Sequence, residues 1–94
     1  MLDSLRSLYV FAQVAEARSF SRAADRLGMT RSAVSKHVAQ LEAELGVQLM
    51  VRTTRRVVLT EVGERVQASC VRLVEQVEAA HEAALGQGAA LSGL

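Results

Sequence analysis

Hydrophobic residues recur at intervals of three or four through the first half of the chain, the spacing of one face of an α-helix. This pattern predicts a first helix over residues 3–17, a second that ends near residue 27 and a third that ends near residue 44. Ser19 or Ser21 suits the start of the second helix and Thr30 that of the third, while Gly46 suits the end of the third. The expected buried positions are Leu5, Leu8, Phe11, Ala12, Val14 and Ala15 in the first helix and Val34, Val38, Leu41 and Leu45 in the third.

Two short β-prone runs follow, residues 48–52 and 57–59, and they flank the polar sequence Thr53–Arg56. A β-hairpin is the economical interpretation of this arrangement. An isolated two-stranded hairpin is only marginally stable in water. The hairpin is therefore expected to pack against the helices through Leu49, Val51 or Val58.

The last long element is a helix over residues 61–85, which Thr60 is suited to cap. Its apolar residues alternate at intervals of four and three, the heptad spacing of a helix that packs along a second helix. A core this small is not expected to bury such a stripe, so the pattern predicts a homodimer. The predicted dimerisation seam consists of Val66, Cys70, Leu73, Val77, Ala80 and Ala84.

Ala24, Gly28 and Val34 have the spacing of a helix-turn-helix. Ala24 lets two helices cross closely, Gly28 adopts a positive φ in the turn without strain, and Val34 anchors the second helix in the core. The predicted fold is mainly α. A winged helix-turn-helix of three helices and a short β-hairpin wing occupies residues 1–60, followed by a linker and dimerisation helix over 61–86. Residues 87–94, rich in glycine and without periodicity, are expected to form a flexible tail.

The exposed side of the second helix of this motif is polar and basic, and such a helix enters the major groove of DNA. Arginine contacts guanine through two hydrogen bonds, and small side chains allow close approach. Arginines in the hairpin could hold phosphates or enter the minor groove. The alternative explanations are that the polar side chains of the helix only face solvent and that the arginines only keep the hairpin soluble. The candidate DNA-binding residues are Arg31, Ser32, Ser35 and Lys36 in the helix and Arg52, Arg55 and Arg56 in the hairpin.

The uneven distribution of charge along the chain supports DNA binding more strongly than the net charge of +1 does. Residues 1–60 carry nine basic and five acidic side chains, a net +4, whereas residues 61–94 carry two and five, a net −3. Only three aromatic residues are present, which argues against stacking of single-stranded bases. A single cysteine, no secretory signal and no long apolar run indicate a cytoplasmic protein.

Catalytic and metal-binding patterns are absent from the sequence. His37 and His81 fall on different helices without a cysteine or carboxylate cluster beside them, so neither a metal nor another cofactor is expected. His37 is expected at the edge of the DNA-facing surface or in solvent. Glu42, Glu44 and the glutamates of the long helix are interpreted as solvated, with no paired carboxylates for acid–base catalysis. The chain is therefore not expected to be an enzyme.

The segment SFSRAADRLGMTRSAVSKHVAQLEAELGVQLMVRTTRRVVLTEVG resembles the N-terminal domain of LysR-type transcriptional regulators. The matching motifs cover residues 21–27, 30–36, 41–46, 49–55 and 59–63. The resemblance implies a winged helix-turn-helix whose linker helix pairs with a second copy, antiparallel to it. It also maps DNA contacts onto Thr30, Arg31, Ser32, Ser35 and Lys36, and onto Arg52 and Arg55 at the wing.

The sequence departs from the family pattern at three positions. Arg31 stands where glutamine is usual, Ser32 where proline is frequent, and Met50 where phenylalanine or leucine is usual. The resemblance further implies an effector-binding α/β domain, which these 94 residues do not contain. The expected function is sequence-specific binding of double-stranded DNA by a bacterial regulator, as a homodimer on an interrupted inverted repeat. The alternative is a winged-helix module that docks proteins without binding DNA.

Overall fold

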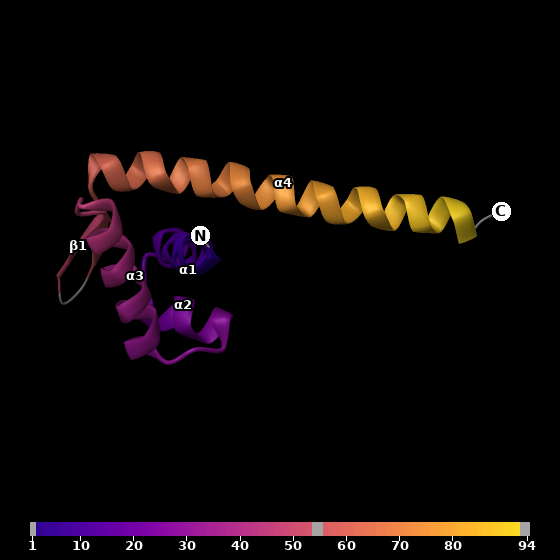
Figure 1. The fold of residues 1–94 in the computed structure, drawn as a ribbon. Helices are drawn as coiled ribbons and strands as arrows, with labels where there is room; N and C mark the ends of the chain where they lie inside the picture. The colour runs from indigo at the N-terminus through magenta and orange to yellow at the C-terminus, as the bar shows by residue number, and fades with distance from the viewer. Residues whose placement is uncertain (1, 54–55, 93–94) are drawn as a thin grey trace.

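The structure, a computed structural model, describes residues 2–53 and 56–92, with side chains over 4–53 and 56–86. Three helices, α1 (Leu2–Ala17), α2 (Phe20–Leu27) and α3 (Arg31–Leu45), pack against one another. They are followed by the antiparallel strands β1 (Met50–Arg52) and β2 (Val57–Leu59) and by α4 (Glu61–Ser92). Helix α4 crosses α1 and projects beyond it (Figure 1), so the molecule is 56 Å long and 20 Å thick. The predicted mainly helical fold with a hairpin wing is confirmed.

The turns between the helices have the predicted chemistry. The Ser19 and Thr30 hydroxyls each accept a 3.1 Å hydrogen bond from a backbone N–H in the first turn of α2 and α3. Gly28 and Gly46 follow these helices with φ of 65° and 69°, in the left-handed region where a side chain would be strained. Local sequence thus determines where α2 and α3 begin and end.

The core differs from the prediction near the ends of two helices and on the outer face of the hairpin. Leu5 and Leu45 are exposed, because Leu45 is the last residue of α3 and Leu5 lies early in α1. In the hairpin, Val51 pairs with Val58 on the outer, exposed face. Side chains alternate along a strand, so the inward face carries the neighbouring residues instead. The buried hydrophobic residues are Val10, Phe11, Ala12, Val14, Ala15, Phe20, Ala23, Ala24, Val34, Val38, Leu41, Leu49, Met50, Val57, Leu59 and Cys70.

Glu42 is not the solvated residue that the sequence suggested. It is half-buried on α3, and its Oε2 accepts hydrogen bonds from the backbone N–H groups of Leu49 at 2.7 Å and Met50 at 3.4 Å. Hydrogen bonds to a carboxylate are among the stronger ones in proteins. Glu42 therefore ties the start of the wing to the third helix.

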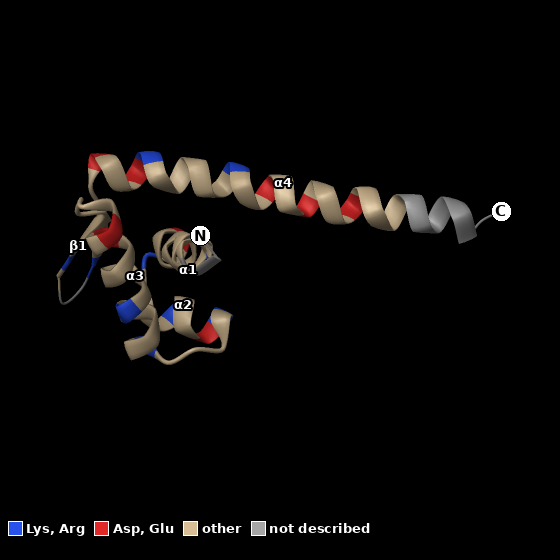
Figure 2. Cartoon of the chain, in the orientation of Figure 1, with Lys and Arg blue, Asp and Glu red and all other residues tan. Residues whose placement is uncertain are grey.

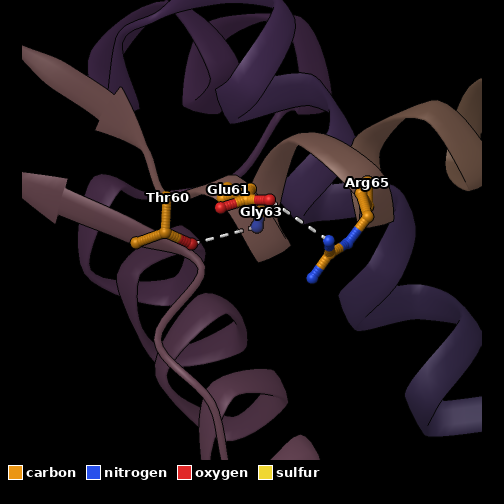
Figure 3. Close-up of polar contacts among 4 residues, drawn as sticks. All are labelled: Thr60, Glu61, Gly63 and Arg65. Atoms are coloured by element: carbon orange, nitrogen blue, oxygen red, sulfur yellow. Dashed lines mark hydrogen bonds and ion pairs between the residues drawn. The ribbon is translucent and has the colours of Figure 1, made fainter.

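Helix α4 begins directly against the chain that leads into the hairpin. Thr60 donates its hydroxyl to Gln48 O at 2.7 Å and accepts from Gly63 N–H at 3.0 Å, the contact drawn in Figure 3. The Thr60 N–H donates to Leu49 O at 2.9 Å. Gly63 lies so close to this carbonyl that a Cβ at position 63 would overlap it. The first turn of α4 is thus fixed to the core by the hydrogen bonds of Thr60 and by the close approach of Gly63 to the Leu49 backbone.

The far end of α4 differs from the prediction. The helix extends to Ser92 rather than ending near residue 85, so the predicted tail is mostly helical. Glycine weakens a helix by about 1 kcal/mol without breaking it, and the sequence has no proline to stop it. Residues 93–94, the last of the predicted tail, lie outside the described residues. Over the described part of the chain, no helix is long and apolar enough to cross a bilayer.

The predicted seam on α4 is divided by the tertiary structure. Cys70 is 4% exposed and belongs to the core of the single chain, with its Sγ 3.7 Å from Leu8 O, and Val66 is half-buried beside it. Contact between α1 and α4 accounts for this burial, which the sequence pattern did not reveal. Burial also raises the pKa of the Cys70 thiol. The exposed part of the seam comprises Leu73, Val77, Ala80 and Ala84.

Candidate nucleic-acid interface

The first turns of α3 present the predicted polar face. Arg31, Ser32 and Lys36 are exposed and Ser35 is half-buried, while Val34 on the opposite side is fully buried. Four of the predicted side chains therefore lie on one accessible face, held from behind by the core. A helix supported in this way can insert its N-terminal turn into a groove without losing its own packing.

Arg52 connects the wing to this helix. Its guanidinium donates a 3.0 Å hydrogen bond to Ser35 Oγ on α3 and lies 4.1 Å from the centre of the Phe20 ring on α2. Such a cation–π contact stabilises by about 0.5–1 kcal/mol at an exposed site. Arg52 consequently fixes the orientation of β1 relative to both helices of the helix-turn-helix.

The described part of the wing tip has a closed backbone geometry. Thr53 N–H donates to Arg56 O at 2.9 Å, and Arg56 N–H donates to Thr53 Oγ1 at 2.9 Å. These bonds close the turn at its base and leave the Arg56 side chain exposed. Arg55, the third predicted wing arginine, lies outside the described residues.

The helix and the wing form one concave surface. A shallow hollow is lined by Arg31, Ser32, Ser35 and Lys36 of α3 together with Arg52 of β1. The structure thus brings together five of the predicted DNA-binding residues from two separate segments. Thr30 caps α3 at the edge of this surface, where its Oγ1 accepts the Ala33 N–H.

Among the described residues, the basic side chains of this surface have no acidic partner. On other faces, Arg26 lies 3.6 Å from Glu16 and Arg65 lies 3.4 Å from Glu61. No residue that the structure describes gives the side chains of Arg31, Lys36 or Arg56 a hydrogen bond or an ion pair. Figure 2 shows basic segments on α2, α3 and the hairpin, with acidic segments also on α2 and α3, and mainly acidic segments along α4, which carries basic ones too. The interface is therefore positive and without internal compensation.

Two residues were misjudged or missed by the sequence analysis. His37 is half-buried, and its Nδ1 lies 3.2 Å from Oγ of the buried Ser7 on α1, so it is not a solvent residue. Arg18 follows α1 and lines a second basic hollow with three of the predicted arginines. Its one sequence signal is its place directly before the N-cap Ser19.

A different kind of surface lies on the other side of the molecule. Between α1 and α4 there is an apolar groove of about 450 Å³, lined by Leu5, Tyr9, Leu73, Val77 and neighbouring residues. Leu73 is 41% exposed and Val77 is 50% exposed. Among the described residues, no group of His, Cys, Asp or Glu is arranged to hold a metal ion.

Comparison with known proteins gives consistent matches. The sequence profile of "Bacterial regulatory helix-turn-helix protein, lysR family" matches residues 5–64. The chain is 43% identical over 90 residues to an uncharacterized HTH-type transcriptional regulator, YfeR, of Shigella flexneri. That alignment covers 96% of this chain and 29% of YfeR, so the chain spans less than a third of that relative's length.

Two similar solved structures are complexes with DNA. The BenM DNA-binding domain with catB site 1 DNA has a TM-score of 0.79 and 32% identity, covering 92% of this chain and 94% of that chain. The CbnR DNA-binding domain with DNA has a TM-score of 0.79 and 30% identity, covering 89% and 97%. The fold and element order found here are thus those of these domains.

Proposed function

Because the chain belongs to the lysR family of bacterial regulatory helix-turn-helix proteins, we propose that it binds double-stranded DNA sequence-specifically, as a homodimer, in the bacterial cytoplasm. Membership in this family makes the chain a DNA-binding regulator and not an enzyme. Our proposal concerns which residues contact DNA, whether the chain forms a dimer, and the form of the DNA site. The chain spans 29% of the length of the similar regulator YfeR.

The observation that carries the proposal is the uncompensated basic surface formed by α3 and the wing. Arg31, Lys36 and Arg52 line one hollow, although they come from two segments of the chain. Anionic phosphates along DNA are the natural complement of such a surface. The BenM and CbnR domains, which have a similar fold, were solved with DNA.

Recognition would proceed through the N-terminal turns of α3 in the major groove. Arg31 and Lys36 are exposed there and can donate to base edges, with guanine O6 and N7 as the best-matched acceptors for arginine. Ser32 and Ser35 are short enough to let the helix backbone approach the bases. The Ser35 hydroxyl keeps its own proton for donation, because Arg52 uses only its oxygen.

The wing would hold the DNA backbone beside the groove. Arg52, Arg55 and Arg56 belong to this segment, and an arginine fork matches phosphate geometry. Arg52 is already oriented by Phe20 and Ser35, so it would lose little rotamer freedom on binding. Thr30, at the start of α3, is proposed as a further backbone contact at the edge of the site.

The dimer would form along the exposed part of the seam. Leu73 and Val77 lie next to Leu5 and Tyr9 of α1, so a second copy of α4 would cover both helices. Ala80 and Ala84 continue this stripe and permit close approach, while Val66 and Cys70 support it from within. With two-fold symmetry the two α3 helices would meet an interrupted inverted repeat.

We expect duplex binding to weaken steeply with salt. Each phosphate neutralised by lysine or arginine contributes a slope of about −0.9 to log K against log[salt]. Several such contacts per chain are available on the basic surface, and the measurement is fluorescence anisotropy of duplexes selected from a random library. A flat salt response, or no binding to the selected pool, would contradict the proposal and favour a protein-docking module.

Two arginine substitutions should separate base recognition from phosphate binding. Arg31→Ala is expected to cost about 1–3 kcal/mol on the selected site and to relax the preference at one base position. Arg56→Ala should weaken specific and unrelated duplexes by similar factors. Repeating the selection with each variant gives the comparison. Equal losses on both kinds of duplex for Arg31→Ala would show that Arg31 does not contact a base.

A further inference from the structure

A second hollow lies between the end of α1, the start of α2 and the wing. Its volume is about 300 Å³, and its lining includes Arg18, Arg31, Arg52 and Arg56. These four arginines come from the end of α1, the start of α3 and both sides of the wing tip. Residues far apart in the sequence are therefore gathered into one basic concavity.

The charges in this hollow have no acidic counterpart. None of its described lining residues is an aspartate or glutamate. The Arg52 guanidinium is engaged by Phe20 and Ser35, but Arg18, Arg31 and Arg56 have no side-chain partner among the described residues. Arginine does not lose its proton in proteins. The mutual repulsion of these groups therefore favours occupation of the hollow by an anion.

Arg18 holds an unusual backbone conformation at this place. Its φ is 55°, in the left-handed region, and its N–H ends α1 by donating to Val14 O at 2.8 Å. Glycine adopts this conformation at no steric cost. Glycine would therefore end the helix with less strain than arginine does. What arginine adds at position 18 is its charge.

We propose that this hollow binds a phosphate group of the DNA backbone, with Arg18 and Arg56 as sequence-independent contacts. The inference rests on the proposed function. Arg31 and Arg52 line both this hollow and the one against α3, so the two hollows are adjacent. A duplex seated on α3 would accordingly bring its backbone, rather than a free anion, to Arg18. The fork of a guanidinium matches two phosphate oxygens.

The test compares Arg18→Gly with the matched control Arg26→Gln in salt-titrated duplex binding. Losing one phosphate contact reduces the magnitude of the slope of log K against log[salt] by about 0.9. The affinity of the variant is then about eightfold lower than that of the wild type at 0.1 M salt, and the two affinities converge near 1 M. Arg18→Gly should lose equally on selected and unrelated duplexes, and its thermal midpoint should stay unchanged or rise. The control Arg26→Gln should leave the slope unchanged, because Arg26 pairs with Glu16 and does not line the hollow.

The remaining outcomes separate the two proposals. Wild-type binding with an unchanged slope in Arg18→Gly would overturn the phosphate contact alone, whereas a wild type that binds no duplex would overturn the proposed function with it. Inorganic phosphate titrated at constant ionic strength, without DNA, is expected to show no saturable binding. Saturation that Arg18→Gly abolishes, with the DNA slope unchanged, would assign the hollow to a free anion instead.

Discussion

Replacing Gly63 with alanine is expected to destabilise the domain by about 2–4 kcal/mol. The added Cβ would overlap the carbonyl of Leu49, which is backbone and cannot rotate away. Relieving the overlap moves α4 off the core, and overpacking of this kind costs about 1–3 kcal/mol before any hydrogen bond is lost. The bond between Thr60 N–H and Leu49 O, 2.9 Å long, would weaken as well, adding about 1 kcal/mol.

Thermal unfolding followed by circular dichroism measures this effect. A loss of 1 kcal/mol lowers the midpoint by about 4–8 °C in a domain of this size, so a decrease of at least about 8 °C is expected. Gly86→Ala is the matched control, because Gly86 lies on the same helix with open space around it. Its midpoint should equal or exceed that of the wild type. A wild-type midpoint for Gly63→Ala would show that α4 does not approach Leu49 so closely.

Leu73→Glu is expected to abolish the proposed dimer and lower the affinity for two-half-site DNA by about 10²–10⁴-fold. That range is what joining two binding modules typically contributes. Leu73 lines the apolar groove between α1 and α4 and is exposed in the single chain. A glutamate there would be solvated in the monomer but buried without a partner in a dimer. Dimerisation should therefore weaken, whereas the fold of each chain should not change.

Sedimentation over a concentration series reports the oligomeric state, and duplex binding reports the consequence. Val71→Glu is the control, since Val71 is 49% exposed on the same helix and does not line the groove. It should dimerise and bind two half-sites like the wild type. A monomeric wild type throughout the series, or a Leu73→Glu variant that still dimerises, would refute this interface.

Local chemistry explains why the helix-turn-helix could be predicted from sequence. The Ser19 and Thr30 caps, and the left-handed turns at Gly28 and Gly46, depend on residues within a few positions of one another. Helical periodicity likewise placed Val34, among others, in the core. The exposed polar face of α3 is the complement of that buried face. The same local pattern therefore predicted both.

Residues whose role depends on a partner in another element were predicted poorly. Glu42 has the composition of a solvated helix position, but its carboxylate meets the backbone of Leu49 and Met50. Cys70 fits a heptad seam, yet α1 buries it. The place of Arg18 directly before Ser19 does not reveal that the wing folds beside it. In each case the deciding contact is made with a different element of the fold.

Sequence by itself determined the elements of this protein, their order, and the basic character of residues 1–60, because caps, periodicity and charge are local properties. Tertiary structure decided how those elements meet. It divided the α4 stripe into a core part at Cys70 and an exposed part at Leu73, since only the first lies deep against α1. It also gathered Arg18, Arg31, Arg52 and Arg56 into one hollow, because chain folding alone sets distances between residues so far apart.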